Sequence, residues 1–433
     1  MTRDMTVENV KGTKDRGPQE MLVQERVVDT IKQAFLAYGF VPLGTPALEN
    51  FDVLSAKGAG GDAIKKETYN FKIAGRHLGL KYDQTVPLAR YIAMNPHFVT
   101  PFKRYQYDRA WRYEDIKTGR YREFYQFDID TVGSESMRAE AELLAAVARA
   151  IRLLGFKEFV IRINDRKLLN ACMTKAGLNP KKSLDAFRAI DKLEKIGKKG
   201  VLFELIGLGI DERTAKKLLD YTGLRGNAES VLARLEKEFV NEEGFQELSR
   251  LMRFVNAYGI GKNVQLDLSI ARGLDYYTGP VFEVEISDAG LGSVGSGGRY
   301  DNMIGLFLGQ KIPAVGFSFG VSRIVDVLKI AGMVKEVESV TDVFVCAVNE
   351  SALENAIMLS VQLRDAGLNV ETDVVSKNLK KQIAYADKKQ IPFIIVLGPK
   401  EIEKGIATIR DMKSGKETRA KLERIAPLLL KNK

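Results

Sequence analysis

The segment between Phe102 and Val132 constrains the fold of this 433-residue chain more than any other. Residues 102–114 and 122–132 are rich in aromatic and β-branched side chains, which are common in strands. Residues 115–120 lie between them and include Gly119, which is typical of a loop. The segment therefore predicts a long β-hairpin.

The second strand of this hairpin carries different chemistry on its two faces, because successive side chains of a strand point to opposite sides. One face is apolar and belongs in a core: Tyr125, Phe127 and Ile129. The other face places an amide and two carboxylates beside an aromatic ring: Phe124, Gln126, Asp128 and Asp130. That mixture suits neither a core nor a plain surface, so we interpret it as the wall of a pocket. For Asp130, pairing with a nearby arginine is the alternative.

A second unusual segment runs from Ala271 to Glu283 and reads Ala-Arg-Gly-Leu-Asp-Tyr-Tyr-Thr-Gly-Pro-Val-Phe-Glu. It places the guanidinium of Arg272 shortly before two phenols, Tyr276 and Tyr277. A fixed positive charge can stabilise an oxyanion or a phosphate. Two phenols suit a small aromatic ligand with polar nitrogens. From these residues alone, a turn with two core tyrosines is the alternative.

Residues 314–319 predict a strand, and Gly320 opens a predicted helix that contains Arg323. A helix N-terminus beside an arginine can bind an anion. A surface arginine on an ordinary helix is the alternative. The stretch Gly58-Ala-Gly-Gly61 predicts a flexible loop instead of a phosphate motif, because no strand or helix pattern frames it closely.

Composition narrows the class of protein. No apolar run approaches the roughly 18 residues of a membrane helix, and the charged N-terminus lacks the apolar core of a signal peptide. Two cysteines and two histidines give neither a disulfide framework nor metal-ligand spacing: Cys172, Cys346, His77 and His97. We therefore expect a cytoplasmic protein without membrane attachment or a protein-held metal. The net charge of +10 favours a polyanionic partner, and simple solubility is the alternative.

Hydrophobic periodicity divides the rest of the chain. Apolar side chains at helical spacing over residues 27–38 predict a helix that ends at Gly39, and a later helix ends at Gly155. Residues 165–263 predict an inserted helical unit with three glycine breaks, at Gly177, Gly197 and Gly223. Strand character returns at Val264.

The last part of the chain has a pattern of its own. Residues 331–341 predict a linker. From Asp342 to Leu397, three strands alternate with two helices, which predicts a small α/β domain.

Together these segments resemble the class II aminoacyl-tRNA synthetases, and specifically the histidyl-tRNA synthetase family. The three motifs shared by the class are matched by Tyr38 to Pro46, by Arg112-Tyr-Glu114 with Gly119-Arg-Tyr-Arg-Glu-Phe124, and by Gly316 to Arg323. The segment from Ala271 to Glu283 is similar to the signature of the histidyl enzymes. Lys81-Tyr-Asp-Gln-Thr85 resembles their histidine-contacting segment in its archaeal and eukaryotic form, from which Gln84 is a small departure outside the site.

The resemblance implies an α+β fold with an antiparallel sheet. A class II catalytic domain would span residues 1–330 and include the helical insertion at about 165–263. A linker over 331–341 would lead to an α/β anticodon-binding domain over 342–433.

The resemblance also implies a reaction in two steps. ATP with Mg²⁺ would activate L-histidine to histidyl-adenylate, and the histidyl group would then pass to tRNA(His). In-line attack at the α-phosphorus relies on positioning and charge stabilisation. Arg112 and Arg272 are implied as the catalytic contacts to the α-phosphate. Arg120 and Arg323 are implied to bind the outer phosphates of ATP. Glu114 is implied to accept from the adenine amino group, and Phe124 is implied to stack on the adenine ring.

Histidine itself would be bound through two groups. Oxygens of Asp83, Thr85 and Gln126 would accept from its ammonium. Asp130 would accept from one imidazole nitrogen, and Tyr276 or Tyr277 would serve the other. A buried site of this kind rejects analogues without the hydrogen-bonding groups by about 10⁴–10⁵, so we expect no editing domain.

The implied partners are tRNA and a second copy of the chain in a homodimer. The last domain would read the anticodon as splayed bases. Lys377, Lys380 and Lys381 are candidates for that contact, and a solvated helix face is the alternative. A regulatory paralogue of histidine biosynthesis without aminoacylation activity is the alternative function. Such paralogues typically lack the anticodon domain and lose catalytic motif residues. An unrelated RNA-binding protein would not need the ATP-site arginines.

Overall fold

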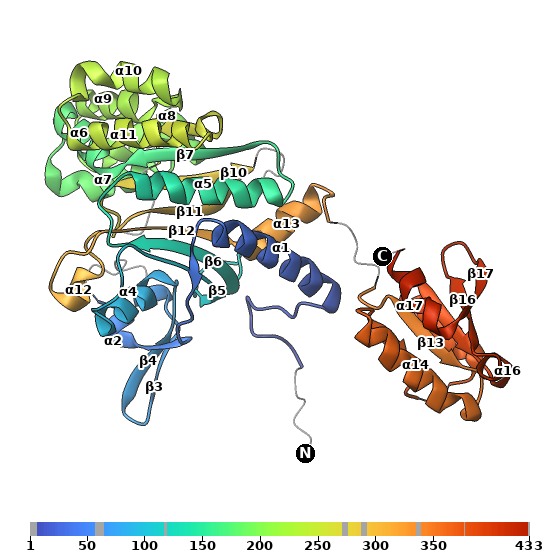
Figure 1. The fold of residues 1–433 in the computed structure, drawn as a ribbon. Helices are drawn as coiled ribbons and strands as arrows, with labels where there is room; N and C mark the ends of the chain where they lie inside the picture. Colours follow the sequence, from blue (N-terminus) through green and yellow to red (C-terminus); the bar gives the residue numbers. More distant parts are fainter. Residues whose placement is uncertain are drawn as a thin grey trace. The chain divides into compact units, whose positions relative to one another are not determined.

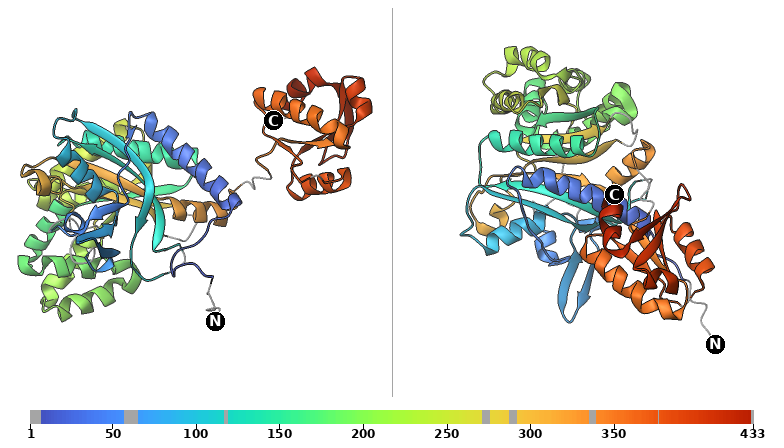
Figure 2. Two further views of the ribbon diagram at one scale, coloured as in Figure 1. Left: turned by 90° about the horizontal axis from the view of Figure 1, so that it is seen from below. Right: turned by 45° about the vertical axis from the view of Figure 1, so that its right-hand side comes forward.

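The structure is a computed structural model that describes residues 7–56, 65–116, 119–270, 276–286, 292–334, 339–375 and 377–431. The chain forms two compact units, Met1–Val334 and Lys335–Lys433. Figures 1 and 2 show the ribbon of both units.

A nine-stranded sheet is the centre of the first unit, counted over its described residues, and it is mostly antiparallel. The strand order is β1-β5-β6-β12-β11-β10-β7-β9-β8, and only the β1–β5 and β7–β9 pairs are parallel. The strands are β1 (Val41–Pro42), β5 (Phe102–Trp111), β6 (Glu123–Val132), β7 (Phe159–Asp165), β8 (Arg225–Asn227), β9 (Val264–Asp267), β10 (Pro280–Ile286), β11 (Ser293–Arg299) and β12 (Ala314–Gly320). A smaller sheet has the order β2-β4-β3 and contains β2 (Leu48–Asn50), β3 (Asn70–Ile73) and β4 (Arg76–Leu80).

The predicted hairpin is confirmed. Strands β5 and β6 pair antiparallel over their whole length, from Phe102 opposite Val132 to Trp111 opposite Glu123. The mixed α+β class and the antiparallel sheet agree with the sequence prediction.

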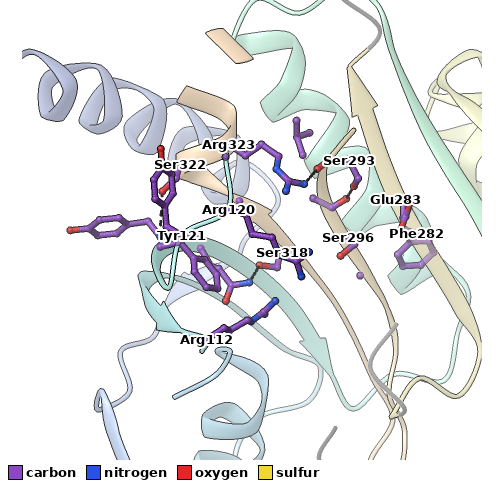
Figure 3. A pocket seen from close by; sticks show the side chains of 18 of the residues that line it. Arg112, Arg120, Tyr121, Phe282, Glu283, Ser293, Ser296, Ser318, Ser322 and Arg323 are labelled. Carbon is purple, nitrogen blue, oxygen red and sulfur yellow. Dashed lines mark hydrogen bonds between the residues drawn. The ribbon is translucent and has the colours of Figure 1, made fainter. Parts of the chain in front are cut away.

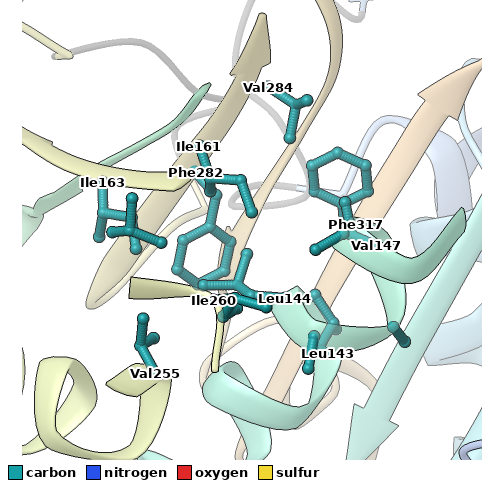
Figure 4. Packing of buried hydrophobic residues seen from close by; sticks show 14 of the residues in the cluster. Leu143, Leu144, Val147, Ile161, Ile163, Val255, Ile260, Phe282, Val284 and Phe317 are labelled. Carbon is teal, nitrogen blue, oxygen red and sulfur yellow. The ribbon is translucent and has the colours of Figure 1, made fainter. Parts of the chain in front are cut away.

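Helices cover one face of the large sheet and bury its apolar side chains. These are α1 (Pro18–Leu36), α5 (Arg138–Leu153) and α13 (Val321–Ile330), all of which contribute to one core (Figure 1). Phe127 and Ile129 of β6 are fully buried there, as the strand alternation predicted. Figure 4 shows Leu144 and Val147 of α5 packed close to Phe317 of β12.

Helix α1 follows from its sequence. Proline occupies its first turn, where the missing N–H costs nothing, and Gly39 follows its end with φ of 77°. Its buried side chains recur at helical spacing: Gln24, Val27, Ile31, Ala34 and Phe35. The remaining short helices of the first unit are α2 (Phe51–Leu54), α4 (Thr85–Met94), α12 (Gly305–Leu308), η1 (Pro180–Lys182) and η2 (Gly261–Asn263).

The helical segment after β7 is divided between two cores. Its helices are α6 (Arg166–Ala176), α7 (Ser183–Ile190), α8 (Leu193–Gly207), α9 (Glu212–Thr222), α10 (Ala228–Phe239) and α11 (Glu243–Ala257). Helices α6 to α9 supply the side chains of a separate apolar cluster. Helices α10 and α11 pack into the main core, and the short strand β8 joins the large sheet beside β9. The predicted break at Gly197 is a kink within α8, where φ is 69°.

The second unit is a five-stranded sheet, over its described residues, with helices on both faces. The order is β14-β13-β15-β16-β17. The strands are β13 (Val343–Ala347), β14 (Val370–Thr372), β15 (Phe393–Leu397), β16 (Ile406–Asp411) and β17 (Glu417–Lys421); the helices are η3 (Glu350–Ala352), α14 (Leu353–Asp365), α15 (Leu379–Lys388), α16 (Pro399–Glu403) and α17 (Leu422–Leu430). Successive residues of β13 alternate between two clusters, one beneath α14 and α17 and the other beneath α15.

The alternation of strands and helices predicted from Asp342 to Leu397 is therefore confirmed. The elements from α16 to α17 were not predicted from the sequence.

Glycines let β11 and β12 approach closely at the middle of the large sheet. A Cβ atom on Gly297 would lie 2.1 Å from the carbonyl oxygen of Gly316 on the neighbouring strand. A Cβ atom on Gly316 would lie 2.0 Å from Oδ1 of Asp130. Neither position has room for a side chain. Gly316 faces Asp130 on the side of the sheet opposite the helices, whereas Gly297 lies opposite Phe282 and Phe317 of the main core.

We predict that Gly297→Ala destabilises the first unit by about 1–3 kcal/mol, because its methyl group would push apart two backbones that no rotamer change can relieve. Gly320→Ala is the matched control at the end of β12, where the nearest atoms to a new Cβ lie at 3.7 Å. Thermal unfolding should show a lower midpoint for Gly297→Ala only. Equal midpoints for both variants would contradict this account of the strand spacing.

Candidate active site

A cavity of about 490 Å³ opens on the face of the sheet opposite α1 and α5 (Figure 3). Its walls come from the β5–β6 hairpin and its loop, from β10 to β12, and from the first turn of α13. A smaller recess of about 70 Å³ adjoins it and shares six lining residues with it: Arg112, Gln126, Tyr277, Ser296, Gly297 and Ser318. The two spaces form one site with a wide basic part and a narrow acidic part.

Three arginines line the wide part: Arg112, Arg120 and Arg323. Arg112 follows β5, donates from Nε to the carbonyl oxygen of Tyr82 at 3.1 Å and lies over the rings of Tyr82 and Phe124 at 4.4 and 5.1 Å. These contacts hold its guanidinium at the boundary between cavity and recess, because it lines both.

Arg323 reaches the cavity from α13. Its Nη1 donates to the carbonyl oxygen of Ser293 at 2.5 Å, as Figure 3 shows. Helix α13 begins after Gly320 without a side-chain cap. The helix end and the arginine together favour an anion here.

Arg120 and Glu114 form an ion pair with each other. The guanidinium of Arg120 donates to the carboxylate of Glu114 across the loop of the hairpin. The resemblance gave them different contacts, with the outer phosphates and with the adenine amino group. The pair uses one nitrogen of Arg120 and one oxygen of Glu114.

The recess brings together all six residues that the sequence suggested for histidine: Asp83, Thr85, Gln126, Asp130, Tyr276 and Tyr277. They come from three distant parts of the chain. The rings of Tyr276 and Tyr277 pack edge to face, with centroids 4.9 Å apart. Burial raises the pKa of both phenols, so both stay protonated as hydrogen-bond donors.

Asp83 is fixed by the start of helix α4. Its Oδ1 accepts from the backbone N–H groups of Thr85 and Val86, both at 3.0 Å. Its Oδ2 is buried and has no hydrogen-bond partner among the described residues. Burial raises the pKa of Asp83, while the Val86 N–H group and Arg112 act in the opposite direction. A cationic donor in the recess would satisfy the open oxygen.

Asp130 combines both of its predicted possibilities. It lines the recess, and it also forms a buried ion pair with Arg104, with 2.7 Å between Nη2 and Oδ2. The hydroxyl of Tyr300 donates to Oδ1 at 2.5 Å. Burial raises the pKa of Asp130, and the charge of Arg104 opposes that shift.

Several residues of the recess were not assigned a role from the sequence: Asp128, Ser296, Tyr300 and Ser318. Asp128 was placed on the polar strand face but was given no function. Ser318 alternates with Gly316 and Gly320 on β12, a signal that the strand period could have revealed. Arg104 lies directly opposite Asp130 in the hairpin register, which only the paired strands reveal.

Arg272 belongs to residues 271–275, which lie outside the described residues. The same holds for Gly58 to Gly61. Ile270 and Tyr277 on either side of the first of these segments line the larger cavity.

The described residues contain no group of three or more histidine, cysteine, aspartate or glutamate side chains that could hold a metal ion. Both cysteines are buried and unpaired, and burial raises the pKa of each thiol to about 12. No helix within the described ranges is long and apolar enough to cross a membrane.

Asp128 makes the stability of the first unit depend on pH. Burial raises its pKa to about 7 from an ordinary value of 3.8, with Asp130 adding to the shift and Arg104 opposing it. Between these two pH values the folded chain holds a proton that the unfolded chain releases. The group therefore favours folding at low pH, and this contribution is lost as the pH rises through 7.

We predict that the free energy of unfolding of Asp128→Asn, measured relative to the unsubstituted chain, rises by about 2–3 kcal/mol when the pH is raised from 5 to 8. The measurement is the difference in thermal midpoint at the two pH values. Asp29→Asn on the exposed side of α1 is the control and should show no such trend. A difference for Asp128→Asn that is constant with pH would contradict the prediction.

Comparison with known proteins agrees with this geometry. The model of the family described as histidyl-tRNA synthetase matches residues 12–324, and an anticodon binding domain model matches residues 342–432. A histidine–tRNA ligase of Cytophaga hutchinsonii is 36% identical, with 97% of this chain and 98% of the relative covered. One from Pyrococcus furiosus is 34% identical, with 98% of each covered.

Solved structures are also similar to this chain. The crystal structure of histidyl-tRNA synthetase from Nostoc sp. PCC 7120 has a TM-score of 0.88 and 33% identity, and the match covers 99% of this chain and all of that one. A structure from Bacillus halodurans C, titled as an ATP phosphoribosyltransferase regulatory subunit/histidyl-tRNA synthetase, has a TM-score of 0.75 at 20% identity and shows the shared fold alone. The fold, the composition of the site and these near-full-length matches lead to one conclusion: the chain belongs to the histidyl-tRNA synthetase family.

Proposed function

We propose that this chain is a histidine–tRNA ligase, which activates L-histidine with ATP and transfers the histidyl group to tRNA(His). The observation that carries the proposal is the continuity of two complementary spaces. An acidic recess sized for a small group opens directly into a cavity lined by three arginines. An amino acid in the recess would present its carboxylate to a nucleotide phosphate in the cavity.

The recess suits the ammonium of the amino acid. Asp83 Oδ2 and Gln126 Oε1 are buried oxygens without hydrogen-bond partners among the described residues. An ammonium has only donors, so it can satisfy both. Asp130 and the two tyrosines would then contact the imidazole, whose two nitrogens require polar partners. Such a site can discriminate by hydrogen bonding alone, without an editing domain.

The cavity suits ATP. Arg112 lies where the carboxylate of the amino acid would meet the α-phosphate, and Arg272 joins it by resemblance. Arg323 and the start of α13 would bind the outer phosphates together with Arg120. Arg120 pairs with Glu114 in the structure. We propose that ATP replaces this pair with two new contacts, one to a phosphate and one to the adenine amino group, while Phe124 stacks on the ring.

Mg²⁺ fits the donor set of the cavity. The described carboxylates that line it are Glu114 and Glu283. Mg²⁺ usually binds through one or two carboxylates, phosphate oxygens and water. We propose that Glu283 would help to hold the ion beside the phosphates, where it would neutralise phosphate charge.

The second unit and the net charge of +10 support tRNA as the partner. Two of the candidate lysines, Lys380 and Lys381, lie in the first turn of α15, and Lys377 packs over the ring of Tyr385 at 4.2 Å. We propose that this end of α15 contacts the anticodon loop.

We further propose a homodimer formed through residues 38–46. Strand β1 is an edge of the large sheet, and its Val41 is half exposed, as expected for a strand that another subunit covers. Sedimentation of a fully active monomer would refute this part of the proposal.

Amino-acid-dependent exchange of pyrophosphate into ATP tests the activity. We expect exchange with histidine alone among the standard amino acids. Arg112→Ala and Arg272→Ala should each lower the rate by about 10²–10³, because each removes charge stabilisation at the reacting phosphate. Arg149→Ala, an exposed arginine on α5, is the control. Exchange with a different amino acid would overturn the histidine assignment, and no exchange by folded chain would favour the regulatory paralogue.

Asp130→Asn tests the imidazole contact. We expect the KM for histidine to rise by about 10–100-fold and the KM for ATP to stay within about twofold, because a charge-assisted hydrogen bond is weakened in the recess only. Asparagine is preferable to alanine here, since it keeps an oxygen that can accept from Arg104 at the place of the ion pair. Equal effects on both constants would refute the assignment.

A further inference from the structure

A chain of two hydrogen bonds crosses from β6 to β12 at the wall of the recess. Gln126 Nε2 donates to Ser318 Oγ at 2.9 Å, and Ser318 Oγ donates to Asp128 Oδ1 at 2.5 Å. Ser318 lies directly opposite Asp128 in the strand register. Figure 3 shows Ser318 at the floor of the cavity. These contacts connect a residue already placed on the ammonium to two residues without an assigned role.

When Asp128 is ionised, the donors and acceptors of these two hydrogen bonds can run in one direction only. A serine hydroxyl has a single proton, and an ionised carboxylate can only accept. Ser318 therefore gives its proton to Asp128 and has only lone pairs left for Gln126. The short oxygen–oxygen distance fits a charge-assisted hydrogen bond. The amide of Gln126 must consequently turn its NH₂ group toward Ser318.

The opposite side of the same amide then faces away from Ser318. Gln126 is only 9% exposed, and its Oε1 has no hydrogen-bond partner among the described residues. A buried acceptor of this kind is costly unless a donor arrives. The side chain lines both the recess and the cavity.

We propose that Asp128 and Ser318 are positioning residues that hold the Gln126 carboxamide with its oxygen toward the ammonium of the amino-acid substrate. This inference rests on the proposed function and deepens it. With the amide reversed, two N–H donors would face an ammonium that has no acceptor to offer. Without Asp128, the hydroxyl of Ser318 is free to donate to Oε1 and to favour that reversed amide.

The charged and polar groups around Asp128 determine the pH at which its carboxylate is ionised and can accept from Ser318. The groups that face Asp128 are Arg104 on β5, Asp130 on the same strand, Asp83 before α4, Tyr277 and Ser318. Arg104 and the hydrogen bond from Ser318 favour its ionised form, and the carboxylates of Asp130 and Asp83 oppose it. Burial raises the pKa of Asp128 to about 7. A bound ammonium would also favour the carboxylate. Measurements at pH 8 therefore test the two hydrogen bonds with Asp128 ionised.

The test is the KM for histidine in pyrophosphate exchange at pH 8. Asp128→Ala and Ser318→Ala should each raise it by about tenfold, the value of one hydrogen bond to a charged group, and leave the KM for ATP within about twofold. Ser318→Thr keeps the hydroxyl and should restore the histidine KM. A threonine variant as weak as the alanine variant would overturn the proposal.

A double-mutant cycle separates positioning from a general loss of structure. In a Gln126→Ala background no amide remains to orient, so adding Asp128→Ala or Ser318→Ala should change the histidine KM by less than about twofold. Additive losses in that background would overturn the proposal. If Asp128→Ala fails to fold, the same double-mutant cycle can be measured with Ser318→Ala, which removes a single oxygen atom.

The two levels of the proposal fail in different ways. If the unsubstituted chain shows no histidine-dependent exchange, the proposed function is refuted and this inference with it. If the unsubstituted chain exchanges normally and the alanine variants at positions 128 and 318 keep its histidine KM, only the positioning role is refuted.

Discussion

The buried ion pair between Arg104 and Asp130 is the interaction on which the site depends. Both side chains are almost fully buried, so the loss of hydration is large, and the partners of the two charges must offset it. Arg104 also donates to the carbonyl oxygen of Gln84 and to Gln106, each at 3.3 Å, and Asp130 accepts from Tyr300. The pair thus joins the hairpin, the start of α4 and the residue after β11. A shift in the hairpin register would leave two isolated charges in the interior.

That requirement explains why the polar face of β6 is so well ordered. The opposite face is fixed by apolar packing, with Phe127 and Ile129 in the main core. Ser318 lies opposite Asp128 in the register of β12 and β6, and its hydroxyl reaches both Gln126 and Asp128. Packing on one side and hydrogen bonding on the other determine the same register. Both sides of the strand therefore support the shape of the acidic recess.

Much of this could be predicted from the sequence, because local periods carry the information. The alternation along β6 separated core from pocket, and the helical spacing of α1 located its buried face. Pairings between distant strands could not be predicted this way. Arg104 opposite Asp130, and Ser318 opposite Asp128, depend on register, which no local pattern reveals. The contact between Arg120 and Glu114 was also missed, because motif resemblance describes residues in terms of their ligands.

Two further strands could not be predicted from the sequence because of their amino-acid composition. Strand β8 consists of Arg225, Gly226 and Asn227, which have little strand propensity and owe their conformation to β9. Strand β17 is largely exposed and carries lysine, arginine and glutamate, as an edge strand often does. Such a strand resembles a loop in its sequence. In both cases the neighbouring strand supplies the order that the segment lacks by itself.

The division of the helical segment between two cores has a consequence for how the molecule opens. Helices α6 to α9 bury their apolar side chains mainly against one another, whereas α10 and α11 are part of the main core. Cooperative opening follows such boundaries, because each cluster loses its burial as a whole. Helices α7 to α9 can therefore exchange their amide protons through a local transition that leaves the sheet and its acidic recess intact. We therefore expect the face of the sheet that carries the recess to stay folded while these outer helices open.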